Sequence, residues 1–108
     1  SSGDVTINVS AIAYQRTAVT TTTTASIADK ILGVSASAAL EIRLPNASGY
    51  AAGQYLTIKD EAGNANSNNI TIKTSNSQTI DGESQITLES PYAAINLYCD
   101  GSAKFFIY

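Results

Sequence analysis

The sequence predicts an all-β domain, an antiparallel β-sandwich or jelly roll of about eight to ten short strands. Three observations support this fold class. Apolar and polar residues alternate along most of the chain, turn residues recur roughly every 8 to 12 residues, and helical spacing is hard to find. A chain of 108 residues can bury one core, so residues 1–108 are expected to form a single domain, the C-terminal fragment of a longer fibrous protein.

The strands follow from the alternation, because a strand with one buried face places an apolar residue at every second position. The apolar positions of the expected strands are Val5, Ile7 and Val9; Leu40, Ile42 and Leu44; Leu56 and Ile58; Ile70 and Ile72; Ile86 and Leu88; and Ile95, Leu97 and Cys99. Cys99 therefore belongs to the inward-facing set, where it is expected to be an inert core residue.

Two segments depart from simple alternation. Residues 26–34 are the best helix candidate, but Gly33 lies within them and β-branched threonines precede them, so a strand or short extended piece is expected. Residues 20–24 are five consecutive threonines, which suit an extended edge segment or a loop better than a flexible linker.

Turn residues separate the expected strands. Asp81-Gly82 and Asp100-Gly101 are hairpin signals, because both residue types tolerate the positive φ of two-residue turns, although either pair can also close a longer loop. In residues 60–66, three oxygen-bearing side chains could face a calcium ion, but no bidentate acid ends the loop. An Asx-stabilised turn at Asp60 is therefore expected, with no metal site.

The composition excludes several classes of function. Six Lys/Arg against nine Asp/Glu, with no basic cluster, argue against a nucleic-acid partner. The absence of His and the single cysteine remove a His-based triad, a Cys/His zinc site and an internal disulfide. No catalytic residue and no cofactor are expected, so the chain is not predicted to be an enzyme. The longest nearly apolar stretch, residues 92–99, is far shorter than the ~20 residues that cross a bilayer, so stable membrane insertion is not expected.

The last strand has apolar or aromatic groups on both faces, at Phe105, Phe106, Ile107 and Tyr108. Residues 11–14 and 92–95 show the same two-sided character, which usually means that the outer face is covered as well. A subunit interface at residues 105–108 explains this pattern. The alternative is a central terminal strand with a loop draped over it.

The polar surface consists largely of small side chains, because Ser, Thr and Asn supply 33 of the 108 residues. Such a surface suits either a stable β-protein or the recognition of neutral sugars. The loop residues Asn64, Asn66, Ser67 and Asn68 are the candidates for receptor binding, since they can hydrogen-bond a neutral glycan.

The order and spacing of short segments over residues 27–108 resemble a module found at the carboxyl ends of bacteriophage tail fibres, tailspikes and tail-needle knobs. The segments are LPNA (44–47), GQYLTIKD (53–60), GNA (63–65), NITI (69–72), TIDG (79–82) and LYCDG (97–101), followed by an aromatic ending. The family often has a Trp near Phe105 or Phe106, which this sequence lacks, although a Phe can fill the same place in the core.

The resemblance implies a homotrimeric knob-like or TNF-like tip domain in the virion. Such a domain would contact a bacterial surface glycan or an outer-membrane component during attachment or penetration. The alternative is a purely structural trimerisation or capping module, with receptor or enzymatic sites elsewhere in the full-length protein. The family has no shared catalytic residues, so none is assigned to this chain.

Overall fold

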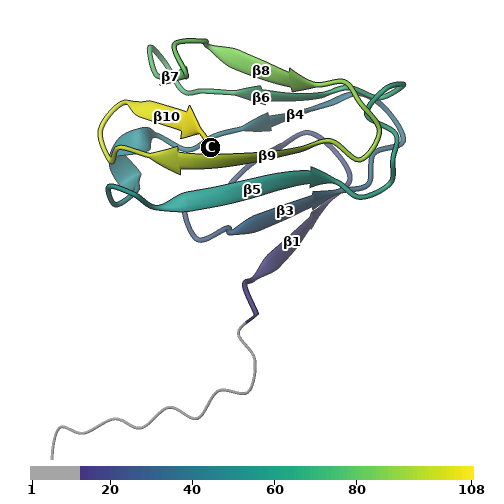
Figure 1. The fold of residues 1–108 in the computed structure, drawn as a ribbon, viewed down its shortest axis with the longest axis horizontal. Helices are drawn as coiled ribbons and strands as arrows, with labels where there is room; N and C mark the ends of the chain where they lie inside the picture. The colour runs from purple at the N-terminus through teal and green to yellow at the C-terminus, as the bar shows by residue number, and fades with distance from the viewer. Residues whose placement is uncertain (1–12) are drawn as a thin grey trace, which may run out of the picture.

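The computed structural model describes residues 13–108, which form ten strands and one short 3-10 turn (Figure 1). The elements are β1 (Arg16–Val19), β2 (Thr23–Thr24), β3 (Ile31–Val34), β4 (Leu40–Arg43), η1 (Ala47–Gly49), β5 (Tyr55–Asp60), β6 (Ile70–Lys73), β7 (Thr79–Ile80), β8 (Gln85–Leu88), β9 (Ala94–Cys99) and β10 (Lys104–Ile107). The predicted all-β class is confirmed for these residues. The expected strand through Val5, Ile7 and Val9 lies outside them.

The strands form two mixed sheets, one of six strands in the order β1-β3-β5-β9-β10-β7 and one of four in the order β2-β4-β6-β8. From β1 to β8, each strand lies in the opposite sheet from the strand before it. Within the described residues, β9 and β10 are the only consecutive strands that pair with each other. The chain therefore winds between the two sheets instead of forming a series of hairpins (Figure 1).

The prediction of antiparallel pairing is wrong for most of the molecule. Among residues 13–108, five strand pairs are parallel and three are antiparallel. Parallel neighbours need a long crossover connection, and here a strand of the other sheet supplies it, so β1, β3 and β5 run in the same direction. The expected antiparallel pattern holds for β5 with β9, β9 with β10, and β6 with β8.

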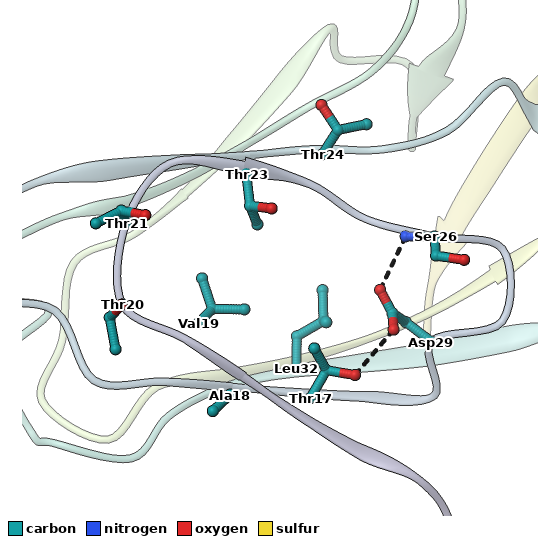
Figure 2. Close-up of a pocket in the computed structure, with 10 residues that line it drawn as sticks. All are labelled: Thr17, Ala18, Val19, Thr20, Thr21, Thr23, Thr24, Ser26, Asp29 and Leu32. Atoms are coloured by element: carbon teal, nitrogen blue, oxygen red, sulfur yellow. Dashed lines mark hydrogen bonds between the residues drawn. The ribbon is translucent and has the colours of Figure 1, made fainter.

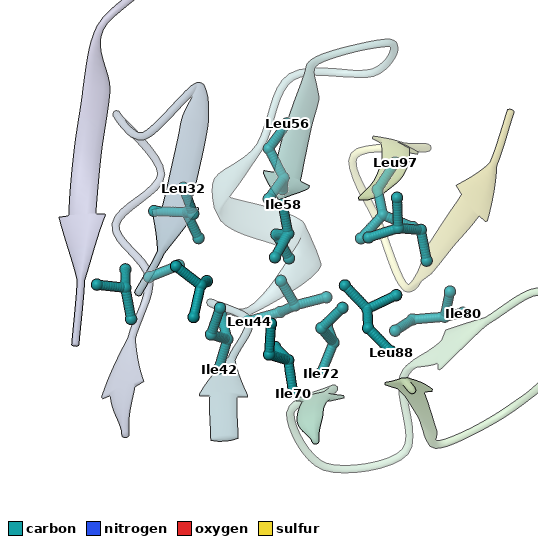
Figure 3. Packing of buried hydrophobic residues seen from close by; sticks show 14 of the residues in the cluster. Leu32, Ile42, Leu44, Leu56, Ile58, Ile70, Ile72, Ile80, Leu88 and Leu97 are labelled. Carbon is teal, nitrogen blue, oxygen red and sulfur yellow. The ribbon is translucent and has the colours of Figure 1, made fainter. Parts of the chain in front are cut away.

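The core lies between the two sheets, where the inward residues of both meet (Figure 3). The predicted alternation is confirmed by the burial of β4, β5, β6 and β9, in which every second side chain is buried. Cys99 is among the buried residues, and burial raises the pKa of its thiol, which favours the neutral form. The largest fully buried side chains are Phe105, Leu32, Ile42, Leu56, Ile58, Ile70, Ile72, Ile80 and Leu97.

The two irregular segments adopt the extended forms that were expected. Residues 31–34 form β3, and the preceding residues form a turn in which the Asp29 N–H donates to the Ser26 carbonyl at 3.0 Å. In the threonine tract, Thr23 and Thr24 form β2, an edge strand of the four-stranded sheet.

The two Asp-Gly turns differ in length. Asp81 and Gly82 have φ of 48° and 83°, and Ile80 and Glu83 exchange backbone hydrogen bonds of 2.7 and 2.8 Å, so this is a two-residue hairpin turn. The turn at Asp100 is longer, because the chain does not return to the sheet until Lys104. One oxygen of Asp100 accepts hydrogen bonds from three successive backbone N–H groups there.

The expectation of a two-sided strand at residues 92–95 is wrong at its start. Tyr92 lies in a turn, and β9 begins at Ala94. Residues 11 and 12 of the other two-sided segment lie outside the described part of the chain, whereas Tyr14 lies within it and precedes β1.

Candidate functional site

The two outer faces of the sandwich have different chemistry. The four-stranded sheet has polar side chains at its outward positions. On this face the register aligns Thr71 with Thr87 and Lys73 with Gln85. Glu41 of β4 accepts a hydrogen bond from Lys73 at 2.9 Å, and this contact lowers the pKa of the Glu41 carboxyl. This face is typical of a sheet exposed to water.

The outer face of the six-stranded sheet is aromatic instead. Strand register places Tyr98 between Tyr55 and Phe106. The ring of Tyr98 lies 5.3 Å from Phe106 and 5.6 Å from Tyr108, and the ring of Tyr14 lies edge-on to Tyr55 at 6.0 Å. We call these five residues the aromatic face. Their spacing matches the ring separations of interacting aromatic pairs.

The aromatic face is open to solvent in a single chain. Tyr108 is 61% exposed, Tyr14 is 53% exposed and Tyr98 is 38% exposed, while Phe106 is half-buried. Large apolar groups gathered on one exposed face mark an interaction surface more often than isolated exposed residues do.

The structure separates the four predicted interface residues. Phe105 points inward, where it is fully buried and packs edge-on against Tyr50 at 5.6 Å, so it belongs to the core and not to an outer surface. Phe106 and Tyr108 lie on the aromatic face. Ile107 is 40% exposed at the end of β10, but it pairs with the buried Leu97 and so lies on the same face of the strand as Phe105. Of the four predicted residues, Phe106 and Tyr108 therefore belong to the candidate interface on the aromatic face.

Sequence reasoning missed Tyr55 and Tyr98 as members of the aromatic face, whereas Tyr14 belongs to the segment 11–14 that was predicted to be covered on its outer face. Tyr55 and Tyr98 occupy outward positions of strands whose inward positions were identified correctly, so the signal was present in the alternation. The two rings meet because β5 pairs with β9, and Tyr55 and Tyr98, which face each other in this pairing, are 43 positions apart in sequence.

Polar groups border the aromatic face. The Thr57 hydroxyl donates to the Asn96 side-chain oxygen at 2.9 Å, and the Lys30 ammonium lies 5.2 Å from the centre of the Tyr55 ring. Arg16 and Glu61 form an ion pair whose carboxylate lies against Gly33, where a Cβ atom would come within 2.4 Å of Glu61. Gly33 is therefore required for this ion pair to lie flat on the sheet.

The predicted receptor-binding residues lie on one loop, residues 61–69, which joins β5 to β6 at one end of the sandwich (Figure 1). The amides of Asn64 and Asn68 donate to the Ala36 carbonyl at 3.1 and 3.4 Å. The Asn64 carbonyl also accepts from the backbone N–H groups of Ser67 and Asn68. Asn64 and Asn68 therefore hold the loop against residues 35–39.

The other two predicted residues have no such role. Asn66 and Ser67 are exposed, and their side chains make no hydrogen bond to any other residue within 13–108. An exposed amide next to an exposed hydroxyl offers both donors and acceptors to a ligand. The loop thus divides into two anchoring residues and two residues available for binding.

Asp60 anchors this loop from within the protein. Its carboxylate is only 1% exposed and accepts hydrogen bonds from the backbone N–H groups of Gly63, Ala65 and Tyr92 at 3.0, 2.9 and 2.9 Å. Burial alone would raise the pKa of Asp60, but these donors together hold the pKa below its usual value. The expected Asx-type turn is present, and its carboxylate is buried rather than solvated.

Tyr92 is a second feature of this end that the sequence did not reveal. It is 59% exposed and has a φ of 62°, a left-handed conformation that is rare for a bulky residue. Its N–H bonds to Asp60, its carbonyl accepts from Lys59, and its ring covers Gly63, where a Cβ atom would lie 2.6 Å away. The neighbouring Pro91 marks the turn but does not indicate where the ring points.

The structure gives no support to a calcium site at residues 60–66. Both oxygens of Asp60 already accept backbone N–H groups, and the Asn64 amide is bonded to Ala36. Among residues 13–108, no group of three or more His, Cys, Asp or Glu side chains could hold a metal ion. In the same part of the chain, the structure contains no helix with the length and apolar character needed to cross a membrane.

We expect Asp60→Asn to lower the free energy of unfolding by about 1–3 kcal/mol. An amide has one acceptor oxygen, so its NH₂ group would face a backbone donor and leave it unpaired. Urea denaturation measures the change, with Glu89→Gln, which neutralises an exposed carboxylate, as the control. Equal unfolding midpoints for the two variants would show that the buried carboxylate does not anchor the loop.

The same carboxylate predicts a pH dependence. The folded pKa of Asp60 lies below the unfolded value of about 3.9, so its charge stabilises the fold fully above the unfolded pKa. This contribution is lost as the pH falls through the folded pKa. The difference in urea midpoint between the wild type and Asp60→Asn should therefore be constant at neutral pH and shrink below about pH 4. A difference that grows on acidification would contradict the assignment.

Comparison with known proteins adds no relative to this description. No protein-family model matches the chain, and no curated protein matches it either. The features that bear on function are therefore the aromatic face, the loop at residues 61–69 and the segments of residues 27–108 that resemble phage tip modules.

Proposed function

We propose that this chain is the homotrimeric tip domain of a bacteriophage tail fibre, tailspike or tail needle, which contacts the host cell surface during attachment or penetration. The observation that carries the proposal is the aromatic face. It leaves apolar ring surface of the sandwich exposed to water, and burying that surface against a partner would lower the free energy. The resemblance over residues 27–108 supplies the biological setting, in the virion.

A second copy of the chain is the occupant that best suits the aromatic face. The face is built from uncharged rings, and its nearest ion pair, Arg16 with Glu61, is internally neutralised. Aromatic residues are enriched in the buried centres of interfaces, and charged residues are depleted there. The same patch from three chains could meet around a three-fold axis, with the long side chain of Lys30 beside Tyr55 keeping its ammonium group in water.

The alternative explanation is a loop that covers the terminal strand. Within residues 13–108, no loop buries the aromatic face. The aromatic face lies on the outside of the six-stranded sheet, and its members retain their exposure after every described loop is in place. Burial of these rings therefore requires a partner or a segment outside the described residues.

Host contact is assigned to the loop end of the sandwich. Asn66 and Ser67 provide free polar groups there, and Tyr92 provides an exposed ring held in place by Asp60. Tyr92 lies beside Lys59 of β5, and Tyr55 of the aromatic face lies four residues away on the same strand. The two ends of this stretch are about 13 Å apart. This end stays accessible when the aromatic face is covered, and three copies of a weak site would bind more tightly through avidity.

We expect the purified chain to sediment at three times its 11.2 kDa monomer mass at micromolar concentration. Replacing Phe106 and Tyr108 together by Ser should shift the equilibrium toward monomer, because both rings lie on the aromatic face and each large apolar side chain removed from an interface costs about 1.5–3 kcal/mol. Sedimentation equilibrium measures both the mass and the dissociation. A stable wild-type monomer at this concentration would refute the trimer.

The control for this experiment lies on the polar outer face. Replacing Thr71 and Lys73 together by Ser removes an exposed ion pair with Glu41, which contributes at most about 1 kcal/mol. This variant should remain trimeric. Equal dissociation of both double variants would place the interface outside β10.

A second experiment tests host contact. Fluorescently labelled chain should bind at least one strain in a panel of bacteria in flow cytometry, with little dependence on salt because the net charge is only −3. Replacing Asn66 and Ser67 by Ala should reduce binding severalfold. The matched control replaces another exposed amide and hydroxyl, Gln85 and Ser102.

The outcomes separate the two roles of a tip domain. A trimer that binds no strain would favour the purely structural capping module. Binding that survives the loss of Asn66 and Ser67 would move the contact to another surface of the trimer.

A further inference from the structure

A cavity of about 370 Å³ lies at the edge of the sandwich where β1 and β2 are the edge strands. Residues 17–32 surround it, running along β1, across to β2, around a turn and back along β3 (Figure 2). This volume falls in the lower part of the range of small-molecule sites, about 300–1,000 Å³. The cavity lies apart from the loop at residues 61–69, which does not line it.

The lining of the cavity has an apolar part and a hydroxyl-rich part. Val19 and Leu32, both buried, point into the ring from β1 and β3 (Figure 2). Thr17 and Thr23 also point inward and carry hydroxyl groups, while other threonines and Ser26 complete the lining. Cavities with apolar walls and a few convergent polar groups are typical of ligand sites.

Asp29 supplies the only charge in this lining. It is buried, and one of its oxygens accepts the Thr17 hydroxyl at 2.9 Å while the other accepts the Ser26 backbone N–H at 2.8 Å (Figure 2). A carboxylate has about four acceptor positions, so each oxygen retains one after these bonds. Two adjacent acceptors at fixed positions suit a ligand with two neighbouring hydroxyl groups.

We propose that this cavity binds a single neutral sugar ring. A pyranose has an apolar face of C–H groups, which the methyl groups of the lining threonines can contact, and an edge of hydroxyls, which Thr17, Thr23 and Asp29 can bond. Val19 and Leu32 are buried and support this lining from beneath. Its lining holds no Lys or Arg that would favour an anion, and one carboxylate is too few for a calcium ion. The proposal goes beyond the tip function, because the site is complete within one chain and does not need the trimer.

The experiment titrates ¹⁵N-labelled full chain with the methyl glycosides of glucose, galactose and mannose. At least one of them should shift backbone amide resonances, and the shifts should be confined to residues 17–32. A ligand of this size with ordinary efficiency per atom should bind with a dissociation constant of about 1 mM.

Thr23→Val is the first variant, because it removes one inward hydroxyl and keeps the β-branched shape. It should raise the dissociation constant about three- to tenfold. Thr87→Val, which makes the same change on the polar outer face, should leave it unchanged. Asp29→Asn should weaken binding further, and its amide spectrum and thermal midpoint show whether the ring of residues 17–32 remains folded.

Three outcomes would overturn the proposal. No amide shift with any of the three glycosides would show that the cavity does not take a sugar. Shifts located outside residues 17–32, or equal weakening by Thr23→Val and Thr87→Val, would place binding elsewhere. Shifts of the same amides by calcium chloride and not by the glycosides would assign the cavity to a cation. Each outcome is independent of whether the chain is trimeric.

Discussion

The winding of the chain between two sheets is the constraint on which the other features of this molecule depend. Consecutive strands from β1 to β8 belong to opposite sheets, so each connection between them must pass around an end or an edge of the sandwich. The chemistry of the outer faces is therefore set mainly by outward strand positions, joined on the six-stranded sheet by Tyr14 and Tyr108, which flank β1 and β10. This leaves the polar face of Thr71 and Thr87 and the aromatic face of Tyr98 and Phe106 on opposite sides.

Alternation was sufficient to locate most strands, because it reports which face of a strand is buried, and that is a local property. It could not supply the partner of each strand. Leu32 and Ile58 pair in parallel across 26 residues, and nothing in either segment distinguishes this arrangement from an antiparallel one. Asp81-Gly82 did predict its turn, since positive φ at both positions is a requirement of the local backbone.

The candidate site was predicted only in part, for the same reason. The loop was identified from its Asn and Ser content, but composition does not show that Asn64 is bonded to Ala36 while Asn66 is free. The Asx turn that Asp60 forms with Gly63 is local, so the sequence can predict it. The hydrogen bond that Asp60 accepts from the Tyr92 N–H joins residues 32 positions apart, and the sequence cannot predict it. Tyr92 acquires its position through that long-range bond.

The anchoring of Tyr92 also explains how a strained residue persists in a small domain. A left-handed φ at a bulky residue costs on the order of 1–3 kcal/mol and needs surrounding contacts to maintain it. Here the buried carboxylate of Asp60 fixes the N–H, Lys59 binds the carbonyl, and Gly63 leaves room for the ring. The same carboxylate holds the adjacent loop, so the exposed ring and the free groups of Asn66 and Ser67 are positioned together. A surface ordered in advance loses less entropy on binding, which suits a weak site repeated on several chains.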